Sequence, residues 1–156
     1  MADASYAFQT ILCAVDFSEH SGHALRYASV LASRFGARLL VLNIADPLLV
    51  AAARASHTDL VGETRTDLRN FVDRVLADAG SPAPGTEVIV ESGEPPKEIL
   101  EVASREHADV IVMGSLGLTG YRKYIYGSTT SHLLSQTHVP VLVVPMGSGQ
   151  NSEIKN

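Results

Sequence analysis

The sequence is short of the residues that build disulfide frameworks and zinc sites. Its 156 residues contain a single cysteine, Cys13. One thiol cannot form a disulfide within the chain, and it cannot supply a zinc site of the usual cysteine spacing. Because Cys13 stands inside the apolar stretch TILCAV, we expect a small buried side chain on a strand rather than a redox centre.

The chain also lacks an excess of positive charge and any long apolar run. Twelve lysines and arginines stand against 17 aspartates and glutamates, a formal net charge of −5. This balance argues against a general nucleic-acid interface, which needs a basic face. No apolar stretch approaches the roughly 20 residues of a membrane span, and residues 1–10 show neither the basic start nor the apolar core of a signal peptide. We therefore expect a cytoplasmic protein with neither a nucleic acid nor a membrane as its partner.

The sequence does have a regular alternation of apolar runs and amphipathic stretches. With 46% hydrophobic and 19% charged residues, its composition favours one folded domain over 1–156, with a core at about 10–145. Uninterrupted Leu, Val and Ile are typical of strands that helices cover on both faces. The stretch TILCAVDF predicts a first strand that begins at Thr10 and ends at Asp16. Further strands are predicted at 37–46, 86–92, 108–114 and 139–145.

Helical spacing of apolar residues predicts helices between these strands. Ser18 is a candidate N-cap for the first helix, and Gly36 supplies its stop. Its inner face is expected to hold Leu25, Ala28, Leu31, Ala32 and Phe35. Further helices are expected from about 59 to the turn cluster 79–85, within 93–107 and within 128–138, while 47–58 is an ambiguous connection with some helix.

The order of these elements decides the fold class. Strands and helices alternate along the whole chain, which requires parallel pairing with right-handed crossovers. The predicted fold is therefore α/β, a single doubly wound sheet. In such a sheet, ligands bind outside the carboxyl ends of the strands, where the strand order reverses.

This rule selects three strand ends as candidate binding segments. Asp16 follows the first strand, Ile44 closes the second, and a loop with three glycines follows the fourth. A carboxylate at Asp16 suits a ribose hydroxyl, because it accepts hydrogen bonds and would repel a phosphate. Backbone groups around Ile44 are placed to meet the edge of an adenine.

The loop after the fourth strand has a defined glycine spacing. It has the form G-x-x-G, nine residues, then G-S, at Gly114, Gly117, Gly127 and Ser128. Residues without a Cβ let the backbone approach an anion, and the free N–H groups at 127–129 would favour a phosphate at the start of the next helix. Arg122 and Lys123 would add positive charge. The pattern is neither a P-loop nor a dinucleotide fingerprint, so a phosphate cradle and a simple helix cap at Ser128 or Thr129 remain alternatives.

Over about 10–145 the sequence resembles the universal stress proteins. The resemblance rests on ILCAVDFS, LLVLNIAD, GEPPKEILEVASREHADVIVMGS and, most specifically, GSLGLTGYRKYIYGSTTSHLLSQTHVPVLVV. The last segment fits the G-2x-G-9x-G-[S/T] spacing of the family's nucleotide-binding branch. The resemblance implies a Rossmann-like five-stranded parallel sheet in the order 3-2-1-4-5. It also implies ATP across the ends of strands one and four, with ADP or AMP as other ligands and Mg²⁺ accompanying ATP.

The resemblance also assigns residues by position. Asp16 would hold the ribose, the backbone of Ile44 the adenine, and Ala14 and Val15 would line the base pocket. Met113 belongs to the same nucleotide-binding set. The residues implied around the phosphates are Gly114, Ser115, Gly117, Gly127, Ser128 and Thr129. A homodimer through the last strand, 139–144, is implied as well, and such pairing would cover an apolar edge.

No dedicated catalyst stands out among the residues. Phosphoryl transfer needs a placed nucleophile, a base and usually a metal. The candidates are His20 and His23 on the first helix, His57 in the ambiguous segment and Asp46 as a Mg²⁺ ligand. We expect an ATP-binding module of stress response or signalling without dedicated catalytic activity. The alternatives are a slow ATPase or phosphotransferase and an interaction dimer that leaves the nucleotide site empty.

Overall fold

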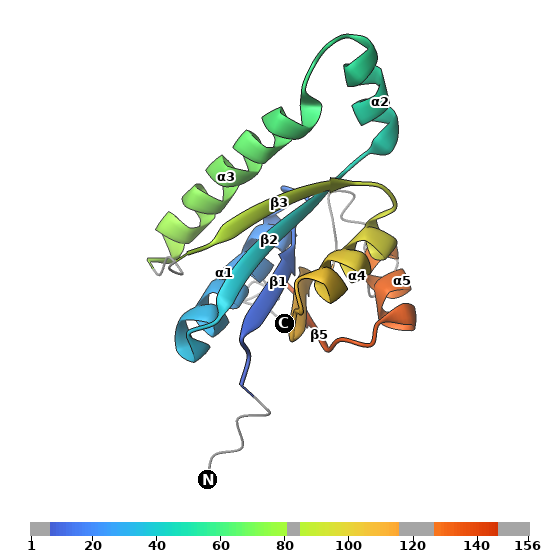
Figure 1. The fold of residues 1–156 in the computed structure, drawn as a ribbon. Coiled ribbons are helices and arrows are strands. Elements are labelled where there is room, and N and C mark those ends of the chain that lie inside the picture. The colour runs from blue at the N-terminus through green and yellow to red at the C-terminus, as the bar shows by residue number, and fades with distance from the viewer. Residues whose placement is uncertain (1–6, 81–84, 116–126, 147–156) are drawn as a thin grey trace, which may run out of the picture.

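The computed structural model describes residues 7–80, 85–115 and 127–146. At its centre lies a five-stranded sheet in which every pair of neighbouring strands is parallel (Figure 1). The strands are β1 (Thr10–Ala14), β2 (Arg38–Ala45), β3 (Glu87–Ser92), β4 (Val110–Gly114) and β5 (Val141–Val144). Their order across the sheet is β3-β2-β1-β4-β5. The predicted doubly wound α/β fold and its strand order are confirmed.

Helices cover both faces of this sheet. They are α1 (Glu19–Phe35), α2 (Pro47–Ala55), α3 (Leu60–Ala79), α4 (Pro95–Arg105) and α5 (Ser128–Gln136). Helices α1 and α3 pack on one face, and α4 and α5 pack together on the other (Figure 1). Helix α2 packs against α3 at one end of the molecule. None of the helices in the described ranges is long and apolar enough to cross a membrane.

The side chains of β1 show why its sequence is apolar without interruption. Successive residues of a strand point to opposite faces, and both faces here are covered. Ile11 and Cys13 belong to the buried cluster under α1 and α3, whereas Leu12 belongs to the cluster under α4 and α5. All three are completely buried. The prediction of helices on both faces followed from this continuity and is confirmed.

The predicted limits of α1 are confirmed in detail. The hydroxyl of Ser18 accepts a hydrogen bond from the backbone N–H of Ser21 at 3.1 Å, which is the bond of an N-cap. At the other end Gly36 adopts a left-handed conformation with φ 61°, as a helix-terminating glycine does. Phe35 is the exception on the predicted inner face: its side chain is 47% exposed and meets the ring of Phe8 edge-on.

Several predicted boundaries differ from the structure by one or two residues. β1 ends at Ala14 rather than Asp16, because the backbone N–H of Asp16 donates to the hydroxyl of Ser21 instead of to a neighbouring strand. Residues 47–58, for which the sequence predicts a connection with some helix, contain the regular helix α2, and the carboxylate of Asp46 caps its first turn. α5 ends at Gln136, two residues before the predicted end, and the next residue has extended backbone angles.

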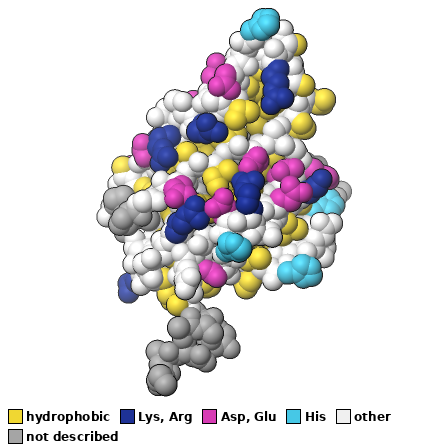
Figure 2. Space-filling view, in the orientation of Figure 1, with side chains coloured by type: hydrophobic (Ala, Val, Ile, Leu, Met, Phe, Trp, Pro, Cys, Tyr) yellow, Lys and Arg dark blue, Asp and Glu magenta, His cyan; other side chains and the backbone are white. Residues whose placement is uncertain are grey.

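Ion pairs join the sheet edge at β3 to its neighbours. Arg38 on β2 pairs with Glu87 on β3 at 2.7 Å and with Glu106 at 3.1 Å, and Arg105 pairs with Glu91 on β3 at 2.8 Å. Figure 2 shows basic and acidic side chains side by side on this face. The hydrogen bonds that Arg38 donates to the carboxylate of Glu87 raise the pKa of the Arg38 guanidinium. Charged side chains on an edge strand discourage pairing with another chain.

We expect Cys13 to be unreactive in the folded protein. Its side chain is fully buried in β1, and this burial raises the pKa of the thiol well above its usual range. Because the thiolate is the nucleophile, iodoacetamide should leave the native protein unlabelled and label it completely in denaturant. Mass spectrometry of both samples tests this expectation. Labelling of the native protein as fast as a free thiol would contradict it.

Candidate functional site

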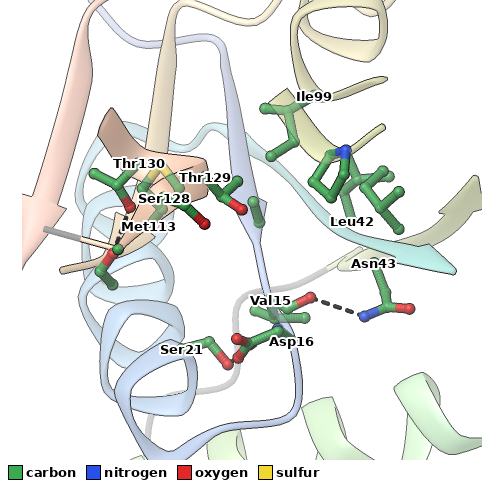
Figure 3. A pocket seen from close by; sticks show the side chains of 15 residues that line it. Val15, Asp16, Ser21, Leu42, Asn43, Ile99, Met113, Ser128, Thr129 and Thr130 are labelled. Atoms are coloured by element: carbon green, nitrogen blue, oxygen red, sulfur yellow. Dashed lines mark hydrogen bonds between the residues drawn. The ribbon is translucent and has the colours of Figure 1, made fainter. Parts of the chain in front are cut away.

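A pocket of about 310 Å³ opens at the carboxyl ends of β1, β2 and β4, beside the first turns of α4 and α5 (Figure 3). It lies where strand order reverses, since β1 is flanked by β2 on one side and β4 on the other. This is the position at which an open α/β sheet binds its ligands. The predicted site residues that line it are Ala14, Val15, Asp16, Ile44, Met113, Gly114, Gly127, Ser128 and Thr129.

Among the described residues of the predicted set, Ser115 does not line the pocket. Ser115 follows β4 and donates its backbone N–H to the carbonyl of Val144, outside the lining. Gly117 lies outside the described residues, as do Arg122 and Lys123. The structure therefore brings together most of the predicted set from strands and helices that are far apart in the sequence.

Asp16 is held at the pocket by the turn between β1 and α1. Its Oδ1 accepts a hydrogen bond from the backbone N–H of Ser18 at 3.1 Å, and its own N–H donates to Oγ of Ser21 at 3.2 Å. The residue is partly buried. Among the described lining residues, Asp16 carries the one charged side chain. The carboxylate is therefore the main source of charge on this part of the pocket wall.

Six further lining residues were missed in the sequence: the apolar Leu42, Pro95 and Ile99 and the buried polar Ser21, Asn43 and Thr130. The side-chain amide of Asn43 donates to the carbonyl of Val15 at 2.9 Å (Figure 3), Ser21 is the partner of Asp16, and the hydroxyl of Thr130 donates to the carbonyl of Gly114 at 3.2 Å. Each bond ties two elements of the pocket together. A signal for Asn43 was present, because it is the one polar residue in the apolar run of β2.

The pocket has an apolar side and a polar side. In Figure 3, Leu42 and Ile99 lie opposite Ser128 and Thr129. The apolar side comes from β2 and the start of α4, and the polar side from the first turn of α5. Such a division suits a ligand with a flat apolar part and a charged end.

The start of α5 presents backbone donors. Its N-cap is Gly127, which has no side chain to accept a hydrogen bond from the first turn. The interpretation of Ser128 or Thr129 as a simple cap is therefore wrong, since both lie inside the helix. The carbonyl of Ser115 accepts the N–H of Gly127 at 2.8 Å, which fixes the helix start beside β4. Free N–H groups at a helix start attract anions.

Gly114 is a glycine for a reason that the sequence does not reveal. A Cβ at this position would lie 3.0 Å from the backbone carbonyl oxygen of His20 on α1. The end of β4 and the first turn of α1 thus pack backbone to backbone. This close packing favours glycine at position 114, whether or not an anion also approaches it.

The remaining candidates of the sequence, His20, His23, His57 and Asp46, are not among the residues that line the pocket. Asp46 caps α2 with its carboxylate on the N–H of Leu48 at 2.8 Å. The ring of His23 meets Tyr27 with centroids 5.2 Å apart, and His57 follows α2 with φ 57°. Within the described ranges, no group of three or more His, Cys, Asp or Glu residues could hold a metal ion.

The fold and the pocket together define an open, doubly wound α/β protein with a pocket at the carboxyl ends of β1, β2 and β4. Comparison with known proteins adds the family. The model of the universal stress protein family matches residues 7–145. The chain belongs to this family.

Individual relatives match this chain over nearly their whole length. A universal stress protein of Thermus aquaticus is 33% identical over 144 residues, which cover 88% of this chain and 98% of the relative. The solved structure of MJ0577, a universal stress protein of Methanocaldococcus jannaschii, superposes with a TM-score of 0.73 at 25% identity and covers 90% of this chain and 98% of its own. A universal stress protein crystallised in complex with cAMP has a TM-score of 0.63 at 26% identity and covers 88% of this chain and 97% of its own.

Proposed function

We propose that the pocket binds an adenine nucleotide, with ATP as the first candidate, and that the chain is a dimeric nucleotide-dependent module of stress response or signalling. One observation carries this proposal: a single pocket is lined by the carboxylate of Asp16, by an apolar wall and by the start of α5, where Gly127 has no side chain to cap the helix. The complex of a similar universal stress protein with cAMP supports the choice of an adenine nucleotide.

Each part of the nucleotide has a matching part of the pocket. The adenine would lie on the apolar side, with its edge toward the backbone of Ile44 and its face near Ala14 and Val15. The ribose hydroxyls would donate to the carboxylate of Asp16, an acceptor that repels phosphate. The phosphates would lie at the start of α5, where N–H groups and the helix dipole favour negative charge.

The same set of residues favours binding over catalysis. Asp16 is the sole titratable side chain in the described lining, and it is assigned to the ribose rather than to a reacting phosphate. Because the described residues offer no cluster of metal ligands, Mg²⁺ would enter on the phosphate oxygens of ATP. We therefore propose a nucleotide-binding module rather than a dedicated ATPase.

The proposed dimer uses β5, the strand at one end of the sheet. It pairs with β4 on one side, and its Leu142 is 38% exposed. Leu134 on the neighbouring α5 is 40% exposed. A second copy paired along β5 would satisfy the backbone groups of the edge strand and cover these apolar side chains.

Titration calorimetry with ATP tests the nucleotide site. We expect the wild-type protein to bind with a Kd below about 1 mM, and Asp16→Asn to weaken binding by about 10-fold to 100-fold, because a hydrogen bond to a charged group is lost. Asp46→Asn is the matched control: its carboxylate caps α2 and is not part of the pocket lining, so its affinity should equal that of the wild type.

Two results would contradict the proposal. The first is an absence of binding at millimolar ATP. The second is an equal loss of affinity in Asp16→Asn and Asp46→Asn, which would show that the effect does not come from the pocket. Mass spectrometry of nucleotide released from freshly purified protein then identifies which adenine nucleotide the protein carries.

A further inference from the structure

Phe17 has an unusual backbone conformation directly beside the proposed ribose-binding residue. Its φ is 66°, in the left-handed region that bulky side chains rarely adopt. It stands between Asp16 and Ser18, where the chain leaves β1 and enters α1. A strained conformation persists only where its surroundings hold it in place. The contacts of Phe17 therefore show what maintains this turn.

The hydrogen bonds of the turn do not account for a phenylalanine. They join Asp16, Ser18 and Ser21 through backbone N–H groups, a carboxylate and two hydroxyls. A glycine at position 17 would permit every one of them and would adopt the left-handed conformation without strain. The role of the phenyl ring therefore lies in a contact outside the turn.

The ring of Phe17 connects the turn to α3. Its centroid lies 5.5 Å from that of Phe71, and the two rings meet edge to face at 78°. Phe71 is 5% exposed and belongs to the cluster under α1 and α3. The guanidinium of Arg74 lies 5.7 Å from the centroid of the Phe71 ring. The partner of Phe17 is thus fixed in the core, while Phe17 itself is 37% exposed.

We propose that Phe17 is a positioning residue for Asp16. Its ring, held against Phe71 on α3, fixes the turn in which the carboxylate of Asp16 accepts the N–H of Ser18 and faces the pocket. Phe17 does not line the pocket, so it acts on the nucleotide through Asp16. The inference rests on the proposed role of Asp16 in holding the ribose.

Removal of the Phe17 ring is expected to lower one part of the nucleotide affinity and to leave the rest unchanged. Without the ring, the turn samples other arrangements, and the carboxylate meets the ribose hydroxyls less often. In the proposed arrangement the adenine contacts come from the end of β1 and from β2, and the phosphate contacts come from α5, whereas the ring of Phe17 packs on Phe71 of α3. Removal of the ring should therefore weaken only the part of the affinity that depends on the ribose hydroxyls.

Calorimetry with two ligands isolates this part. The ratio of the Kd for 2′,3′-dideoxy-ATP to the Kd for ATP measures the contribution of the ribose hydroxyls. We expect a ratio of about 10 or more in the wild type, and a ratio that falls to about 1–3 in Phe17→Ala and Phe17→Gly. The Kd for the dideoxy ligand should be unchanged. Phe17→Gly removes the ring together with the strain, so it keeps the test valid if Phe17→Ala folds poorly.

Three controls separate positioning from a general structural effect. Phe17→Tyr keeps the ring and should keep the wild-type ratio. Phe35→Ala removes a ring of similar exposure that packs on Phe8 at the far end of α1, and it should also keep the ratio. In the double variant Asp16→Asn/Phe17→Ala, the ratio should be no lower than in Asp16→Asn alone, since Phe17 acts through Asp16.

The outcomes distinguish the two proposals. If the wild type does not bind ATP, the proposed function fails. If the wild type binds ATP with a high ratio and Phe17→Ala keeps that ratio, the positioning role is overturned while the function stands. If the Kd for the dideoxy ligand rises as much as that for ATP, Phe17 has only a general structural role, and the positioning role is again overturned.

Discussion

Leu133→Ala is expected to lower the free energy of unfolding by about 2–5 kcal/mol. Leu133 is completely buried in the cluster under α4 and α5, together with residues of β1, β2 and β4. α5 has only nine residues and buries only Thr130 and Leu133. Helices of this length are not stable without packing, so Leu133 supplies most of what holds α5, and with it the polar side of the pocket, on the sheet.

Leu48→Ala is the matched control for this substitution. It makes the same chemical change at a leucine of α2 that is 78% exposed and lies outside the proposed dimer strand. Its removal leaves no comparable cavity, and the expected change in unfolding free energy is within about 0.5 kcal/mol. Urea denaturation followed by circular dichroism measures both variants. Equal losses of stability in the two variants would contradict the packing of α5 described above.

The second large effect is expected from Gly114→Ala, at about 1–3 kcal/mol of lost stability. The new Cβ would lie 3.0 Å from the carbonyl oxygen and 3.1 Å from the carbonyl carbon of His20. These are backbone atoms in the first turn of α1, so no side-chain rotation can make room. The helix would have to move away from the end of β4, at the edge of the pocket.

Gly22→Ala makes the same chemical change as Gly114→Ala, but it is expected to raise the free energy of unfolding rather than lower it. A Cβ at Gly22 would meet Phe71 and Val75 at 3.5 Å, which is ordinary van der Waals contact. Because alanine is favoured over glycine inside a helix, the free energy of unfolding of this variant should rise by up to about 1 kcal/mol. Thermal or urea unfolding of the two variants tests the pair. A Gly114→Ala protein as stable as the wild type would show that α1 and β4 are not in close contact.

Most of the fold could be predicted because its signals are local. The continuous apolar runs at β1 and β2 indicate strands covered on both faces, and Ser18 and Gly36 mark the ends of α1 by their own chemistry. Some helix was predicted within 47–58, but the extent of α2 was left open because PLLVAAARA has no polar face. Its Leu48 is 78% exposed and Leu49 60% exposed, so the hydrophobic pattern does not follow burial there.

The candidate site was predicted only in part. Asp16 and the residues at the start of α5 stand at strand ends and near glycines, where a sequence pattern points to binding. Asn43 was missed, although it is a polar residue within an apolar strand, because its role is to hold the carbonyl of Val15, the residue that follows the neighbouring strand β1. The assignment of individual residues to ribose, adenine and phosphate stays a prediction.

The sequence by itself determined the α/β class, the alternation of strands and helices, and the strand ends at which a ligand would bind, because these depend on periodicity and on residues close together in the chain. Only the tertiary structure decided why position 114 favours a glycine, that the ring of Phe17 rests on Phe71, and that α5 depends on Leu133. Each of these contacts joins segments that are far apart in the sequence. The local pattern around one partner contains no information about the atoms of the other.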